Sequence, residues 1–193
     1  MIDNAINHIA AELNQHLKRS FDLNEDVVVI SNILEQDGTV AAHVNNKIVV
    51  SLVNIEKDSV PFRQQNVAGG GGVAGRGVVT APPVFFNLYL MFASYFSGNN
   101  YQEGLKFISK TISYFQSQPV FDHQNSPELD KNIYKLILDI ENLNTQDLSS
   151  LWSVLSGKYL PSILYKVRMV AYDSGAVLKQ TDSLSAPKTR VNT

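Results

Sequence analysis

The sequence predicts an α+β fold, a single domain in which a mixed, mostly antiparallel sheet is flanked by helices. Apolar residues recur every three to four positions in three segments, which is the period of an amphipathic helix. Apolar and β-branched runs of strand length stand between and around them, in no regular alternation with the helices. With 193 residues, 44% of them hydrophobic, the chain can bury about 70% of its unfolded surface in one core.

The first predicted element is a helix over residues 2–17, with one continuous apolar stripe. Asp3 or Asn4 is placed to cap its start. Two strands come next, a short one at 27–30 and a longer one at 47–55. The turn-forming pairs Asp37-Gly38 and Asn45-Asn46 lie between them, which fits a long hairpin or a looser connection.

The middle of the chain is predicted to hold a flexible loop at residues 57–80, because six of the 11 glycines fall within 69–77. We expect the stretch 69–77 to be mobile in the isolated protein and a candidate for ordering against a partner. An apolar strand at 85–96 comes next. Asn100 then caps a helix, with Glu103 in the capping-box position, and Pro119 ends it.

The last part predicts a half-exposed strand at 134–143, a third helix capped by Asn144 or Thr145, and a final strand at 163–172. The sequence is polar and aperiodic from Asp173 onward. We therefore assign one domain to residues 1–173 and a polar tail to 174–193. The tail is expected to contribute little to folding, but to help assembly by adding a strand to a neighbour's sheet edge.

Composition excludes several classes of function. Sixteen basic and 18 acidic residues give a net charge of −2, which argues against nucleic-acid binding and against a polybasic membrane anchor. The chain has no cysteine, so disulfides, thiolate zinc sites and cysteine nucleophiles are ruled out. Its most apolar run, residues 84–96, is too short to cross a bilayer as a helix.

No motif predicts catalysis, a cofactor or a metal ion. Residues 70–75 match the dinucleotide-binding pattern G-x-G-x-x-G, but that site needs a helix to begin there, and the residues that follow cannot begin one. A phosphate-binding P-loop is also excluded, because it needs Lys and then Ser or Thr where this chain has Arg76-Gly77. His8 and His16 lie about 12 Å apart along one helix, too far for a shared metal ion. Asp139 and Glu141 face the same way on a strand, and pairing with Lys166 and Arg168 on a neighbouring strand would account for all four charges.

Two aromatic features are compatible with either a core or an interface. One is a dense run of six rings in a single strand; the other is Trp152 close to Tyr159 near a helix end. The six rings are Phe85, Phe86, Tyr89, Phe92, Tyr95 and Phe96. Low charge content, 18% against a usual ~25%, also suggests surface covered by neighbours.

Several phrases along residues 1–173 resemble the tail-terminator, or sheath-cap, family of extracellular contractile injection systems, phage-tail-like particles of the antifeeding and virulence-cassette type. The longest and most specific is YLPSILYKVRM at 159–169, which comes shortly after Leu151-Trp152. The others are MIDNA at 1–5, FDLNED at 21–26, IVVSLVNIE at 48–56, PPVFFNLY at 82–89, YQEGLKF at 101–107 and QNSPEL at 124–129.

The resemblance implies a phage tail-terminator fold and a non-enzymatic cap that forms a hexameric ring on the inner tube and sheath and stops their growth. It implies assembly in the cytoplasm and then a place in a released extracellular particle. A baseplate or sheath adaptor of the same particle is the alternative. Six domains of this size around a hexagon leave a hole of about 42 Å. The candidate partner contacts are Gly70, Gly72, Arg76, Trp152, Tyr159, Lys166 and Arg168.

Overall fold

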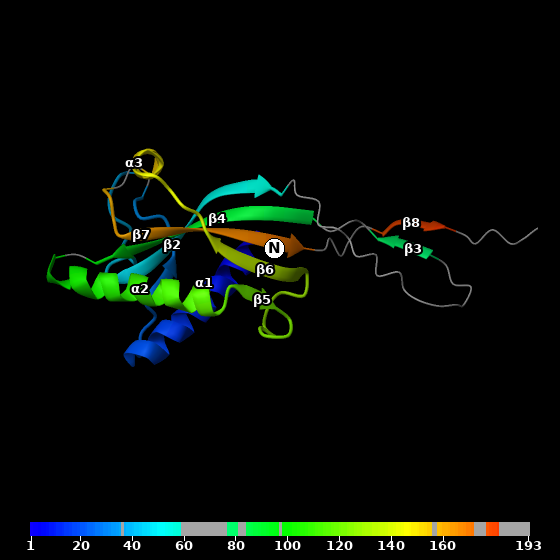
Figure 1. The fold of residues 1–193 in the computed structure, drawn as a ribbon, viewed down its shortest axis with the longest axis horizontal. Helices are drawn as coiled ribbons and strands as arrows, with labels where there is room; N and C mark the ends of the chain where they lie inside the picture. The colour runs from blue at the N-terminus through cyan, green and yellow to red at the C-terminus, as the bar shows by residue number, and fades with distance from the viewer. Residues whose placement is uncertain are drawn as a thin grey trace, which may run out of the picture.

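A six-stranded sheet organises the molecule, with its strands in the order β1-β2-β4-β7-β6-β5 (Figure 1). The computed structural model describes residues 1–35, 37–58, 77–80, 84–96, 98–155, 158–171 and 177–181. The strands of this sheet are β1 (Val28–Ile30), β2 (Lys47–Lys57), β4 (Val84–Tyr95), β5 (Val120–Asp122), β6 (Ile133–Ile140) and β7 (Ser162–Ala171). The predicted α+β class is confirmed.

Two long helices cover one face of the sheet, and a shorter helix covers part of the other (Figure 1). They are α1 (Ile2–Phe21) and α2 (Tyr101–Ser117) on the first face and α3 (Thr145–Val154) on the second. The predicted stripe of α1 is buried from Ala5 to Leu17. Because α1 already begins at Ile2, Asp3 and Asn4 lie inside the helix and do not cap it.

Of the caps predicted for the other two helices, one is confirmed and one is wrong. Asn144 caps α3 as expected, because its side-chain oxygen accepts a hydrogen bond from the Asp147 backbone N–H at 2.9 Å. Asn100 occupies the N-cap position of α2 without a side-chain cap. One turn of 3-10 helix, η1 (Gly98–Asn100), leads into α2, and Glu103 pairs with Lys106 at 2.6 Å instead of closing a capping box.

The connection between β1 and β2 is the looser of the two predicted forms, because these strands run parallel and so cannot be joined as a hairpin. All other neighbours in the sheet are antiparallel. Two left-handed residues allow the turns of this connection: Gly38 with φ +82° and Asn46 with φ +56°. Strand β2 also shifts register between Leu52 and Asn54 where it pairs with β4.

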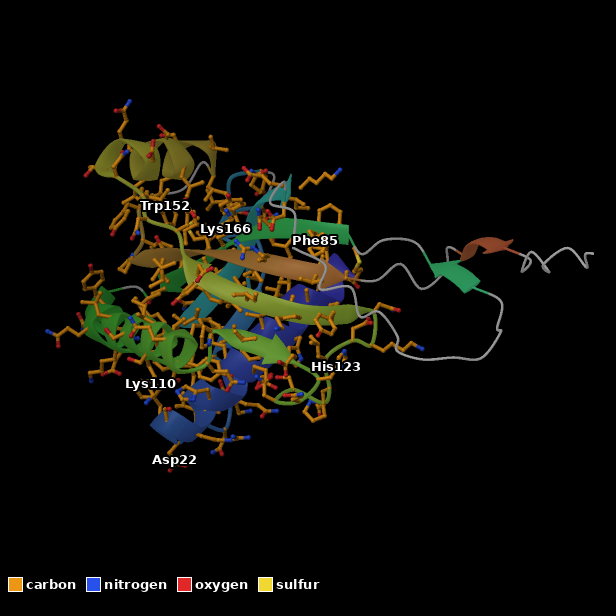
Figure 2. All side chains as sticks on the ribbon, turned by 45° about the vertical axis from the view of Figure 1, so that its right-hand side comes forward. Asp22, Phe85, Lys110, His123, Trp152 and Lys166 are labelled. Carbon is orange, nitrogen blue, oxygen red and sulfur yellow. The ribbon has the colours of Figure 1, made fainter. Side chains whose placement is uncertain are left out.

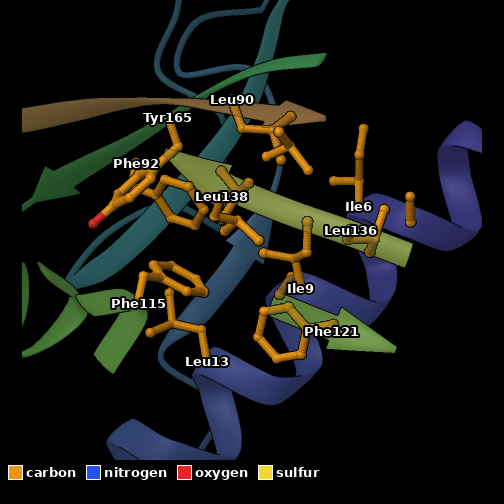
Figure 3. Close-up of a cluster of buried hydrophobic side chains, with 14 of the residues drawn as sticks. Ile6, Ile9, Leu13, Leu90, Phe92, Phe115, Phe121, Leu136, Leu138 and Tyr165 are labelled. Atoms are coloured by element: carbon orange, nitrogen blue, oxygen red, sulfur yellow. The ribbon is translucent and has the colours of Figure 1, made fainter. Parts of the chain in front are cut away.

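The main core lies between the sheet and the two long helices (Figure 3). Phe92 of β4 is fully buried there, with ring centroids 5.3 Å from Phe115 of α2 and 5.5 Å from Tyr165 of β7. Leu13 of α1 and Leu138 of β6 complete the contact between layers. Burial of such aromatic and aliphatic side chains is the main favourable term in folding.

A second, smaller cluster lies on the opposite face, under α3 and the connection that precedes β2. Val49, Met91 and Leu164 face it from three neighbouring strands, and Trp152 reaches it from α3. The rings of Tyr89 and Tyr95 pack against its edge. The aromatic run of β4 is therefore divided between the two faces, as strand alternation requires.

Three short strands were not predicted. β5 forms an edge of the main sheet, while β3 (Gly77–Thr80) and β8 (Val177–Thr181) pair with each other. β3 falls within the segment 57–80 predicted as a flexible loop, and β8 falls within the tail predicted to be aperiodic. Each is too short to show a period, and β3 and β8 are about 100 residues apart in the chain. Of the stretch 69–77 predicted to be mobile, residues 69–76 lie outside the described residues, and Gly77 begins β3.

Candidate assembly surface

Polar side chains from three adjacent strands gather on the second face of the sheet, beside α3. Tyr89 on β4 stands opposite Asn54 on β2 and Lys166 on β7. The next row on the same face pairs Asn87 with Glu56 and with Arg168. Because alternate residues of a strand share a face, these side chains lie on the side that carries Met91 and Leu164. We call Asn54, Glu56, Tyr89, Lys166 and Arg168 the second-face patch.

Tyr89 and Glu56 form the centre of this patch. The Tyr89 hydroxyl donates a hydrogen bond to Glu56 Oε2 at 2.9 Å, and Asn54 Nδ2 donates to Glu56 Oε1 at 3.2 Å. Burial, followed by the hydrogen bond and charge of Glu56 and by the charge of Glu141, raises the pKa of Tyr89 to about 12. Lys166 Nζ lies 5.9 Å from the centroid of the Tyr89 ring, within cation–π range.

Arg168 makes the ion pair of this face, with Nε 3.1 Å from Asp58 Oδ2. The side chain of Asp58 is only 6% exposed. Strands β6 and β7 are neighbours, and Asp139 stands directly opposite Lys166, as the charge pattern predicted. The pairing of Arg168 with Asp139 or Glu141 was wrong: Arg168 reaches toward β2, on the other side of β7 from β6.

An open groove of about 380 Å³ runs between the patch and α3. Among the described residues, three carboxylates line it and no basic residue does: Glu56 from β2, Glu141 after β6, and Asp147 in the first turn of α3. Its apolar lining includes Val154, which is 81% exposed. An acidic groove with apolar walls suits an extended segment that carries apolar and basic side chains.

Among the sequence-predicted contacts, Trp152 and Lys166 lie on this side of the sheet (Figure 2), and Arg168 shares the face of Lys166 on β7. Lys166 and Arg168 belong to the patch. Trp152 is only 4% exposed, so its ring packs inside the chain. Tyr159 is exposed and meets the Trp152 ring edge to face at 6.0 Å. Gly70, Gly72 and Arg76 lie outside the described residues.

Sequence reasoning missed Glu56, Glu141 and Asp147 as members of one surface. Their positions 56, 141 and 147 are far apart in the chain, and they meet only because β2, β4, β7 and β6 are consecutive in the sheet. Asn87 and Tyr89, polar residues two positions apart in a largely apolar strand, were a local signal that this face of β4 carries polar side chains.

The described part of the chain holds neither a cluster of metal-ligating side chains nor a helix able to span a membrane. Across the described ranges, no three His, Cys, Asp or Glu side chains are placed to hold a metal ion together. In the same part of the chain, no helix is both long and apolar enough to cross a membrane. The second-face patch consists of charged and polar side chains held at fixed places on neighbouring strands of the sheet.

The chain belongs to the family described as the Pvc16 N-terminal domain, whose model matches residues 4–184. This confirms the tail-terminator resemblance that the sequence phrases indicate. Among curated proteins, nothing matches the chain.

Two solved structures share the fold. One is the sheath/tube terminator of the PVC extracellular contractile injection system in its extended state, with a TM-score of 0.63 and 12% identity. The other is the tube-terminating cap of the anti-feeding prophage, with a TM-score of 0.58 and 16% identity. They align with 100% and 98% of this chain, which spans 64% and 60% of theirs.

Proposed function

We propose that this chain is the ring-forming domain of a structural cap that ends the growth of the inner tube and sheath of a contractile injection particle. The observation that carries the proposal is its similarity, along the whole chain, to a sheath/tube terminator. The ring is a hexamer, built by head-to-tail contacts between copies. It assembles in the cytoplasm and then forms part of the released extracellular particle.

The two unlike faces of the sheet support a capping role. Helices α1 and α2 cover the first face, while the second presents the acidic groove and the second-face patch. A tube or sheath grows because each added ring presents again the surface that it binds. A ring of domains with one partner-binding side adds to the end without regenerating that surface. Growth then stops by geometry, without an enzymatic step.

Deletion of the gene in a producing strain tests the proposal. We expect tubes or sheaths of uncontrolled length, or particles that come apart at the end distal to the baseplate, while tube and sheath subunits still fold. Particle length in electron micrographs is the measurement, and expression of the chain in trans is the control. Stable particles of normal length after deletion would contradict capping and would favour a baseplate or sheath adaptor.

A further inference from the structure

The outer edge of β2 is open beyond Ser51 in the described part of the chain. β1 pairs with residues 48–50, and Ser31 extends that pairing through hydrogen bonds at Val50 and Ser51. Residues 52–57 pair with β4 on their inner side, and no described strand pairs with their outer side. Leu52 and Ile55 are 39% and 43% exposed there. An open edge that carries apolar side chains is a template for another strand.

The two-stranded ribbon of β3 and β8 has an unpaired strand edge among the described residues that could pair with another strand. β3 and β8 pair with each other and lie beyond the ends of β4 and β7, in line with those strands (Figure 1). Two strands without further support are marginally stable in water, whereas three or more form a stable sheet. β8 has β3 on one side and no other described strand on the opposite side. A third strand along that side would stabilise the ribbon.

Charge favours the same pairing. The charged residues that line the groove beside the open edge, within the described ranges, are all acidic: Glu56, Glu141 and Asp147. The segment 174–193, which contains β8, has three basic residues, Lys179, Lys188 and Arg190, against one acidic residue, Asp182, and so carries a net charge of +2. Complementary charges of this kind steer two surfaces together and fix their register.

We propose that residues 52–57 of β2 receive β8 of a second copy of this chain, so that the sheet of one copy continues into the ribbon of the next. The edge and the ribbon are different surfaces, so the contact is head-to-tail. Contacts of this type generate closed rings when the rotation closes. The inference rests on the proposed ring and names the surfaces that would build it.

Disulfide trapping tests the pairing, because the chain has no cysteine of its own. One set of full-length variants carries Asn54→Cys, Ile55→Cys or Glu56→Cys; a second set carries Lys179→Cys or Gln180→Cys. Pairs are mixed and oxidised, in isolation and in assembled particles. A disulfide requires Cα atoms within about 7 Å. We expect cross-linked heterodimers from mixed variants, and a ladder of higher species from chains that carry both cysteines.

Tyr101→Cys, exposed at the start of α2, is the control for random collision. Cross-linking of every β2–β8 pair at or below its level would overturn the proposal. Disulfides formed only within one chain would show that the ribbon folds back on its own edge, and this result would also overturn the proposal.

Charge variants supply a second readout. Glu56→Gln combined with Glu141→Gln and Asp147→Asn is expected to slow cross-linking several-fold, as is high salt. The matched control changes Glu25, Glu103 and Glu128 to Gln, away from the groove, and is expected to leave the rate unchanged. Equal rates in both triple variants would contradict the charge argument.

The outcomes separate this pairing from capping. Uncontrolled particle length on deletion, without any β2–β8 cross-link, would support the capping function and contradict the edge pairing. β2–β8 cross-links together with particles of normal length on deletion would support the edge pairing and contradict the capping function.

Discussion

Trp152 lies in α3 with its ring against the second face of the sheet. It packs in the cluster that contains Met91 and Leu164, and its edge contact with Tyr159 is the only ring contact that the described residues give it. Because the ring is buried within one chain, any effect of Trp152 on assembly must pass through the position of α3.

We expect Trp152→Ala to cost roughly 3–5 kcal/mol in the free energy of unfolding, because a large buried side chain leaves a cavity. Denaturant unfolding of the isolated protein is the measurement. Tyr159→Ala removes an exposed ring from the same contact and serves as the control, with an expected cost below about 1 kcal/mol. Equal losses of stability in Trp152→Ala and Tyr159→Ala would contradict the assignment of the Trp152 ring to the buried cluster.

Individual side chains were predictable where one strand or helix sets their surroundings. The apolar stripe of α1 follows from spacing alone, and Asn144 was recognised as a cap from its position before an apolar run. The partner of Arg168 was not predictable, because Asp58 reaches it from the far end of a strand that a local pattern does not place. Long-range contacts depend on strand order, which periodicity does not reveal.

At the scale of elements, Gly104 of α2 packs closely against the end of β4. A Cβ added there would meet Ser94 Oγ at 2.5 Å and Phe96 Cβ at 3.0 Å. Glycine weakens a helix interior by about 1 kcal/mol relative to alanine, so its presence here reflects the close approach of helix and strand.

Gly104→Ala is therefore expected to destabilise the protein by about 1–3 kcal/mol from overpacking, partly offset by better helix propensity. Ser94 Oγ is buried and has no hydrogen-bond partner among the described residues, so Ser94→Ala removes the obstacle at little cost. The double variant should recover part of the loss in thermal or denaturant unfolding. Additive losses would show that Ser94 is not the contact that matters.

The longer strands of the main sheet were predictable in type, because their runs are long enough to show a period, whereas the three-residue strand β5 was not predicted. The parallel pairing of β1 with β2, and the pairing of β3 with β8, were not. Both depend on where the chain returns in space rather than on the residues within the strands. The contact that we propose for assembly joins β2 to β8, and each of these strands takes part in one of these two pairings. Sequence reasoning therefore found only some of the residues of the assembly surface.

For the molecule as a whole, two histidines of α1 link stability to pH. Burial lowers the pKa of His8 below its usual 6.5, against the opposing charges of Glu12 and Glu128. Burial, with the charges of Lys110 and Arg19, also lowers the pKa of His16. As the pH falls below 6.5, the unfolded chain therefore binds more protons than the folded chain. The free energy of unfolding that these histidines contribute is fully present above pH 6.5 and is lost as the pH falls through their lowered pKa values.

We expect His8→Gln to flatten the fall in the free energy of unfolding between about pH 7 and 5, where one proton contributes at most about 1.4 kcal/mol per pH unit. The exposed His123→Gln is the control and should leave the slope unchanged. Carboxylates with lowered pKa values, such as those of Asp26 and Asp130, act below 3.8 and do not overlap with this window. An unchanged slope in His8→Gln would show that protonation of His8 does not contribute to the pH dependence of stability.

The place of β7 in the sheet sets the time at which the chain can fold during its synthesis. β7 is the last strand of the main sheet to be made, yet it lies between β4 and β6. At 5–20 residues per second, about one to four seconds separate the end of β6 from the start of β7. Until β7 enters, the inner edges of β4 and β6 stay unpaired, and each is a template for pairing with another chain.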